Sequence, residues 1–232
     1  MSSAASSVGE QPNEHDEPLS QRLYRAIRGK IITGELQPGS RLRERELAEE
    51  FGVSRVPLRE AFPQLEADGF ISSSLRRGVS VTTLTLRDVD ELFEARLGIE
   101  VYATRLAAAR VANGADVDPL RSALAAADAA LLTKDADVIA EANAVLHEEI
   151  VWLAGNSLLR TMMHSISGRY RWIFRMTFTP EAEADGDEHH AMFAAILAGD
   201  PDLAAAVAWT HIEHGRKPTL AYLEGRLPTG EG

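Results

Sequence analysis

Three observations in the sequence predict a mainly α-helical fold. Apolar residues recur at helical spacing along most of the 232 residues. Alanine-rich runs such as 107–109 and 125–127 favour helix. Two short segments, 70–71 and 79–82, have the composition of strands and lie close enough to form a hairpin. The sequence therefore predicts a small N-terminal unit with one β-hairpin, followed by an all-α helical bundle.

The charge of the chain is unevenly distributed. Its net charge is −11, yet residues 19–87 contain twelve Lys or Arg and only eight acidic residues. Residues 88–232 contain twelve Lys or Arg and twenty-three acidic residues. Residues 1–18 are rich in serine and acidic residues and have no Lys or Arg, so we expect a disordered tail there. The basic surplus is confined to the N-terminal unit, which suits contact with a nucleic acid, and the acidic remainder would be repelled by one.

The composition also indicates a compartment. The chain has no cysteine, so it has no disulfides or thiolate metal sites, and it fits a reducing cytoplasm. It has no apolar run of about 18 residues, the length that a membrane-spanning helix needs. The N-terminus lacks the apolar core of a signal peptide. We therefore expect a cytoplasmic protein without a membrane partner.

The N-terminal unit is predicted to contain three helices. The first covers residues 19–35 and ends before the Pro38–Gly39 pair. The second covers residues 44–51 and ends at Gly52, and the third covers residues 54–69. A short helix, a glycine-containing turn and a further helix are the composition cues of a helix-turn-helix.

The third of these helices combines an apolar face with a basic one. Leu58 and Leu65 belong to its apolar stripe, and Arg55 and Arg59 share a neighbouring face near its start. Two guanidiniums placed in this way suit insertion into a DNA major groove, where arginine binds guanine edges or phosphates. The basic edge of an ordinary surface helix would have the same pattern. The Ser54 hydroxyl is expected to cap the helix by accepting a first-turn amide.

Pro63 lies well inside this third helix. It removes the hydrogen bond to the carbonyl of Arg59, and its ring crowds the preceding turn, at about 3 kcal/mol in a regular helix interior. We therefore expect a kink between Arg59 and Phe62.

The predicted hairpin carries Arg76, Arg77 and Gly78 at its tip. A hairpin with a basic, glycine-bearing tip beside a helix-turn-helix is a wing, which contacts the minor groove or phosphates. The alternative is a surface turn that carries two exposed arginines.

At this point the sequence resembles the GntR superfamily of bacterial transcription factors over residues 19–85. The matching segments are LQPG (36–39), LRERELA (42–48), FGVSR (51–55), PLREA (57–61), Leu65, Gly69 and Arg77–Gly78. The resemblance implies a winged helix-turn-helix that binds DNA. Carried over by position, it implies DNA contacts from Arg45, Arg55, Arg59 and Gly78, with Arg43 and Arg77 as further candidates.

The rest of the chain is predicted to be helical throughout. Six amphipathic segments on short connections are typical of a helical bundle. These segments are residues 86–111, 119–132, 135–154, 158–177, 183–198 and 203–223.

Histidine spacing is the most informative feature of this predicted bundle. Asn143 and His147 are four residues apart and share a helix face. His189 lies ten residues before Gly199, at the turn between two helices, and His211 lies twelve residues after it. If these helices are antiparallel, both imidazoles lie about 15–18 Å from the turn and can converge. Three imidazoles and an oxygen ligand suit Zn²⁺, Ni²⁺ or another divalent transition metal, whereas three histidines on separate helix surfaces would never meet.

Residues 88–215 resemble the FCD type of effector domain, the branch of the GntR superfamily related to fatty-acid regulators. The landmarks are EARLGIE (94–100), Asn143 to His147, Gly155–Asn156, Glu188–His189, Ala195–Ile196, Gly199–Asp200 and His211–Ile212. By this resemblance, residues 88–225 form an effector-binding and dimerisation domain. His147, His189 and His211 are implied metal ligands, and Asn143 stands where an aspartate is common.

Two polar residues decide how such a site would work. The neutral amide oxygen of Asn143 is a weaker metal ligand than a carboxylate oxygen. We therefore expect weak metal binding, or a site completed by an organic carboxylate. Arg96 would pair with that effector carboxylate. The alternative partner for Arg96 is Glu100, which lies four residues further along the same helix.

The sequence thus predicts a ligand-responsive transcriptional regulator, a repressor, that binds operator DNA as a homodimer and senses a small carboxylate through a metal-containing site. One rival is a hydrolytic metalloenzyme, because histidines around an open position also describe such a site. Against it, the sequence offers no well-placed general base: Glu148 and Glu149 follow His147, but neither has an assigned partner. A second rival is a metal-free regulator whose histidines bind the effector directly.

Overall fold

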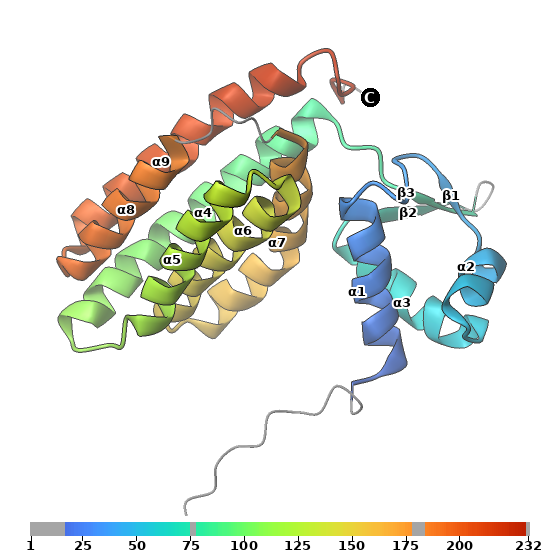
Figure 1. Cartoon of the computed structure of the whole chain (residues 1–232), viewed down its shortest axis with the longest axis horizontal. Helices are drawn as coiled ribbons and strands as arrows, with labels where there is room; N and C mark the ends of the chain where they lie inside the picture. The colour runs from blue at the N-terminus through green and yellow to red at the C-terminus, as the bar shows by residue number, and fades with distance from the viewer. Residues whose placement is uncertain (1–16, 75–77, 178–183, 231–232) are drawn as a thin grey trace, which may run out of the picture.

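The computed structural model describes residues 17–74, 78–177 and 184–230. Six elements form a compact N-terminal unit, which we call the head (Figure 1). These are α1 (Leu19–Ile32), β1 (Arg41–Leu42), α2 (Glu44–Phe51), α3 (Arg55–Ala67), β2 (Ile71–Ser74) and β3 (Gly78–Val81). Most of the expected tail and the wing-tip residues Arg76 and Arg77 lie outside the described residues.

The hairpin predicted for the head is confirmed, and it belongs to a small antiparallel sheet with the strand order β1-β3-β2. Ile71 pairs with Val81 in the hairpin, and Arg41 pairs with Ser80 on the other edge of β3. The sequence did not predict β1, because two residues are too few to show an alternating pattern. Because β3 pairs with both β1 and β2, the sheet fixes the base of the hairpin.

Helix α3 packs its apolar side into the head, with Leu58 and Leu65 fully buried. Ser54 occupies the N-cap position in an extended conformation, but its side chain makes no capping hydrogen bond. The expected cap is therefore wrong. The physical reason is Pro57, which takes the third helical position and lacks one of the two amides that a capping hydroxyl normally reaches. The helix continues through Pro63 as one element, and the kink there stays a prediction.

The second part of the chain is a bundle of the six predicted helices, and we call it the bundle. They are α4 (Leu86–Ala112), α5 (Asp118–Thr133), α6 (Ala136–Leu153), α7 (Ser157–Thr177), α8 (Ala184–Leu197) and α9 (Pro201–Leu223). Side chains define several of their starts. Thr85 and Asp88 form a capping box at α4, and Asp135 and Asp200 cap α6 and α9. Among the described helices, none is long and apolar enough to cross a membrane.

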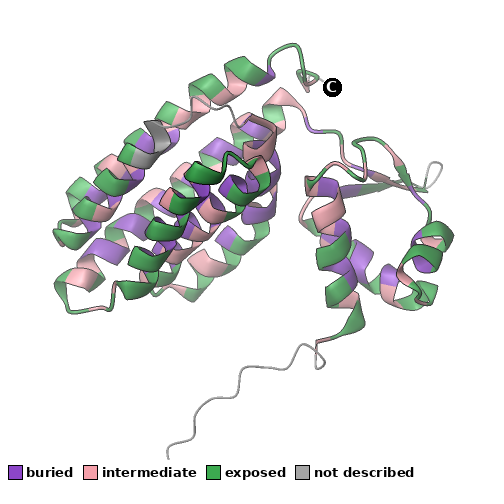
Figure 2. Ribbon diagram, viewed as in Figure 1, coloured by how far each residue is buried: buried purple, intermediate pink, exposed green. Residues whose placement is uncertain are grey.

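Buried residues run along the inside of both parts (Figure 2). One apolar cluster extends from the head into the bundle. At its centre the Phe70 ring stacks on Trp172 of α7, with 5.8 Å between ring centroids. After α9 the chain returns to the start of α4, where the Leu86 amide donates to the Pro228 carbonyl at 2.8 Å. The head is thus packed against the bundle through α7 as well as connected to it by the chain.

Candidate functional site

Three buried histidines meet inside the bundle. His147 of α6, His189 of α8 and His211 of α9 each offer a nitrogen atom, and these atoms all lie within 4.8 Å of one another. The ring centroids of His189 and His211 are 4.7 Å apart, and that of His147 lies 5.4 Å and 5.2 Å from them. The spacing left open whether these histidines meet and the resemblance to the FCD type implied that they do; the structure brings all three together.

The local fold explains why these rings meet. Helices α8 and α9 pack against each other on either side of the tight turn at Gly199, so residues at similar distances from it lie at similar heights. Helix α6, which comes earlier in the chain than this turn, contributes His147. We call His147, His189 and His211 the histidine cluster.

The hydrogen-bonding pattern of the cluster suits metal ligands. His211 Nδ1 lies 2.9 Å from Glu188 Oε2, an outer partner of the kind that fixes the ring orientation of a metal-binding histidine. His189 Nε2 is buried and has no hydrogen-bond partner among the described residues. A buried polar atom without a partner is costly, and a bound cation would satisfy it. The donor set therefore fits a divalent transition metal.

Burial also controls the protonation of His189. Its desolvation, reinforced by the neighbouring His211 and His147, holds the pKa of His189 well below 6.5. The imidazole is therefore neutral in the folded protein, which is the state that ligates a metal.

A pH experiment tests this neutral state. As the pH falls from about 7.5 to 5.5, the unfolded chain takes up a proton at His189 and the folded chain does not, so the metal-free protein should lose stability. The His189→Leu variant should lose less stability over the same interval, measured as the urea midpoint at each pH. An equal or larger loss in the variant would contradict a neutral His189.

A buried ion pair lies directly beside the cluster. Arg96 and Glu100, both on α4, are joined by contacts of 2.7 Å and 3.3 Å, so the salt bridge left open by the sequence is present. Glu100 Oε2 also lies 2.7 Å from His147 Nδ1, although the contact is not aligned as a hydrogen bond. Burial alone would raise the pKa of Glu100, but Arg96 and His147 outweigh it and hold the pKa below its usual range. Glu100 is thus a buried carboxylate anion at the edge of the cluster.

Tyr170 of α7 is a neighbour of the cluster that the sequence did not reveal. Its ring lies edge-on to His147, with centroids 5.5 Å apart, and the Arg96 guanidinium lies 4.3 Å from its centroid. Such cation–π contacts favour a desolvated arginine. Tyr170 comes from a helix without a cluster histidine, so no spacing rule could place it there.

The remaining candidates of the bundle have separate positions. Asn143 is buried on α6, one turn before His147 on the same face. Glu148, considered above as a catalytic base, is instead paired with Arg171 at 2.8 Å. His190 is exposed and contacts Asp128, and the exposed His214 shares the Glu188 carboxylate with His211.

The head presents several arginines to solvent. Arg43, Arg45 and Arg59 are exposed and paired with glutamates of α2, at 2.7 Å, 3.8 Å and 2.8 Å respectively. Exposed pairs of this kind contribute little to stability, so a phosphate can replace the glutamate at low cost. Arg55 is exposed and has no hydrogen bond or ion pair with another described residue.

Two of the exposed arginines, Arg45 and Arg55, help to line a shallow depression between α2 and α3. It is lined by Arg45, Ala48, Glu49, Gly52, Val53, Ser54 and Arg55. Gly78 lies at the start of β3 with a φ of 74°, a left-handed conformation that side chains other than glycine rarely adopt. Its surroundings are open, so backbone conformation rather than space requires the glycine.

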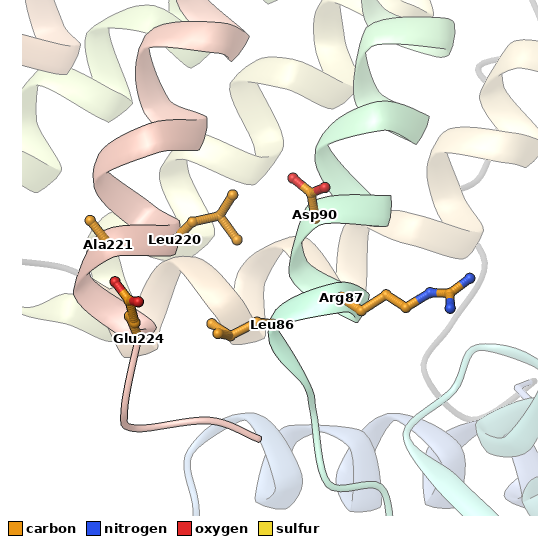
Figure 3. A pocket seen from close by; sticks show the side chains of 6 residues that line it. All are labelled: Leu86, Arg87, Asp90, Leu220, Ala221 and Glu224. Atoms are coloured by element: carbon orange, nitrogen blue, oxygen red, sulfur yellow. The ribbon is translucent and has the colours of Figure 1, made fainter. Parts of the chain in front are cut away.

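A separate hollow of about 510 Å³ opens between the start of α4 and the end of α9 (Figure 3). It is lined by Leu86, Arg87, Asp90, Leu220, Ala221 and Glu224. Arg87 points away from α9 and pairs with Glu91 at 2.7 Å. The polar groups of this hollow do not converge on one point, unlike those of the histidine cluster.

Two family models match this chain, one over each of its two parts. The model of the FCD domain matches residues 91–214, and that of the bacterial regulatory proteins of the gntR family matches residues 19–81. The first match contains the histidine cluster and Arg96. The second contains the exposed arginines of α2 and α3.

Individual relatives are similar to this chain over most of their length. The HTH-type transcriptional regulator YdhC of Bacillus subtilis (strain 168) is 29% identical over 85% of this chain and 89% of its own length. The HTH-type transcriptional repressor GlaR of Escherichia coli (strain K12) is 30% identical over 82% of this chain and 90% of its own. The structure of E. coli McbR/YncC shares the fold, with a TM-score of 0.74 and 23% identity over 90% of this chain and 98% of that one. The chain therefore belongs to the GntR family of bacterial regulatory proteins, with an FCD domain behind its winged helix-turn-helix, and is a transcriptional regulator rather than an enzyme.

Proposed function

We propose that the protein is a ligand-responsive repressor in which residues 19–85 bind operator DNA and residues 88–225 sense a small carboxylate at a metal-containing site. The observation that carries this proposal is the buried histidine cluster, which has an unpartnered nitrogen at His189 and lies in the bundle behind a basic head. A purely structural core would have little reason to gather three imidazoles and an ion pair.

The cluster supplies three of the ligands that zinc or nickel would use, and Asn143 is the proposed fourth. A bound cation would give the site positive charge, which attracts an anionic effector. His189 and His211 would hold the metal from α8 and α9, and His147 from α6. Glu188 and Glu100 would act as outer partners of His211 and His147.

Arg96 is the proposed partner of the effector carboxylate. In the structure its guanidinium contacts Glu100, so an incoming carboxylate would share or replace that contact. Because an arginine has five N–H donors in a planar fork, it can bind two carboxylates through different edges. A metal-free regulator whose histidines bind the effector directly is the second candidate, and the unpartnered His189 nitrogen is compatible with it.

Changing Asn143 to aspartate tests the metal assignment, because the variant should gain zinc affinity. The carboxylate adds a negative charge and a stronger oxygen donor beside the histidines, so zinc should bind more tightly, by roughly tenfold or more. The measurement is a zinc titration against a competing chelator. The matched control is Asn156→Asp, outside the cluster at the start of α7, which should leave the zinc affinity unchanged. An Asn143→Asp protein with unchanged or weaker zinc affinity would refute the ligand role.

The head is proposed to act in a homodimer on DNA. Two recognition helices would enter successive major grooves about 34 Å apart on an operator with inverted half-sites. Contacts come from Arg55 and Arg59 in α3, with Arg43 and Arg45 beside them and Gly78 at the wing. Arg77 is proposed as a further wing contact.

Selection from random duplexes tests the proposed function as a whole. The full chain is incubated with a random DNA pool, bound duplexes are sequenced, and the zinc content of the purified protein is measured in parallel. We expect inverted half-sites and about one metal ion per chain after loading with zinc. Sequences without any enrichment would contradict the operator-binding part. Protein that takes up no zinc but binds acetate, malonate or citrate would favour the metal-free candidate.

A further inference from the structure

Helix α7 touches both the histidine cluster and the end of the recognition helix. Its residues point to different sides, because each step along a helix turns by about 100°. Tyr170 lies on the side that faces His147 and Arg96. Gly168 and Trp172 lie on roughly the opposite side, which faces the head, and Arg169 lies about 100° around the helix from Tyr170, where its long side chain also reaches the head. Figure 1 shows α7 on the side of the bundle nearest α1.

The contacts of α7 with the head concentrate on the C-terminal end of α3. Asp68 is the C-cap residue of α3, and its carbonyl accepts a hydrogen bond from Arg169 Nε at 2.8 Å. A cation at this position also suits the negative end of the helix dipole. The Asp68 side chain is held from the other direction by the hydroxyl of Tyr24 in α1. The end of the recognition helix is thus fixed between α1 and α7.

Two glycines make this close approach possible. Gly69 has a φ of 74°, and any side chain there would collide with the Arg169 guanidinium. Gly168 has ordinary helical geometry, but a Cβ at this position would lie 2.7 Å from Arg28 Nε and 2.7 Å from Phe70 Cζ. Phe70 is almost completely buried and cannot move aside easily. The packing of α7 on the head therefore leaves no space for even one methyl group.

From these contacts we infer that α7 couples the histidine cluster to the recognition helix, with Tyr170 as the positioning residue on the sensing side and Arg169 as the positioning residue on the DNA side. The inference rests on the proposed function, because it takes the cluster to be the site that binds the metal. Metal bound to His147 would restrain the ring against which Tyr170 packs. The same rigid helix would carry that restraint to Asp68 through Arg169 and to Phe70 through Trp172.

Hydrogen exchange on the full chain, with and without Zn²⁺ as the probe, tests this coupling. In the wild-type protein, zinc should slow exchange in the cluster peptides of α8 and α9 and also change exchange in residues 65–74, which include the end of α3. In Arg169→Met, which keeps the aliphatic stem but removes the donor to Asp68, the change at residues 65–74 should disappear. The change in α8 and α9 should remain, with zinc affinity within a few-fold of wild type.

Gly168→Ala provides a second variant, because alanine favours helix and would disturb the contact with the head rather than α7 itself. It should also lose the zinc response of residues 65–74. Its matched control is Gly98→Ala in α4, where a Cβ would meet nothing within 4 Å, and this variant should keep both responses. Zinc protection of α8 and α9 without any change at residues 65–74 in the wild type would overturn the coupling alone. Persistence of that change in both α7 variants would also overturn it. An absence of any zinc effect in α8 and α9 would remove the proposed metal site as well.

Discussion

Replacing Arg55 with alanine is expected to weaken operator binding by roughly 5- to 150-fold while leaving the fold intact. Arg55 lies exposed in the first turn of α3 and has no competing partner among the described residues. A bidentate contact between arginine and guanine provides about 1–3 kcal/mol of discrimination, which corresponds to this range in affinity. The double reversal Arg55→Glu with Arg59→Glu should leave only weak, unselective binding, because it adds repulsion to the lost contacts.

Fluorescence anisotropy with a selected duplex measures this effect at several salt concentrations. If Arg55 or Arg59 contacts a phosphate instead of a base, its removal should reduce the slope of log affinity against log salt concentration by about one, the release of one counterion. Arg121→Ala is the matched control, because Arg121 lies on α5 in the bundle and its side chain is 57% exposed, close to the 62% of Arg59. Equal operator affinities for Arg55→Ala and Arg121→Ala would refute the assignment of α3 as the recognition helix.

His189→Ala is expected to weaken zinc binding by roughly 100-fold or more. Loss of an outer partner of a metal ligand typically costs 10- to 100-fold in affinity, and loss of a ligand itself should exceed this. His189 is a suitable residue for this test because its buried nitrogen has no partner among the described residues that would compete with the metal. The measurement is a zinc titration against a competing chelator, with the folded state checked by circular dichroism.

The adjacent residue provides the control for this second prediction. His190→Ala removes an imidazole from the same helix, but His190 is exposed and contacts Asp128 instead of the cluster. It should therefore bind zinc like the wild type. Zinc affinities that fall equally in the two variants, or in neither, would show that the cluster does not hold the metal.

The helices of this protein could be predicted from sequence because their signals are local. Apolar periodicity and capping residues such as Asp200 lie within each segment, and all six bundle helices were found within a few residues of their observed ends. Strand β1 could not be found in this way, because its two residues form a strand only through pairing with β3, some 38 residues away. The Ser54 side chain makes no capping hydrogen bond, and the sequence does contain the reason, because Pro57 lacks an amide hydrogen in the first turn.

The candidate site could be predicted only in part, because some of its contacts depend on the packing of helices that are far apart in the sequence. His189 and His211 are related by one tight turn, so their convergence follows from helix geometry. The resemblance to the FCD type added His147. Tyr170 comes from α7, a helix without a cluster histidine, so its position depends on the packing of the whole bundle. A spacing of four residues could not show whether Arg96 pairs with Glu100 or with an effector. In the structure Arg96 contacts Glu100.

If the proposed function is correct, occupancy of the histidine cluster changes how tightly the head holds DNA. The most direct test measures the operator dissociation constant of the full chain at one fixed salt concentration in three states: metal-free, zinc-loaded, and zinc-loaded with citrate as a carboxylate probe. We expect the metal-free constant to differ from at least one loaded state by about 5- to 150-fold, the usual range of allosteric coupling, and His189→Ala to abolish the difference. Constants that agree within about twofold in all three states, with zinc shown to be bound at the cluster, would contradict the claim.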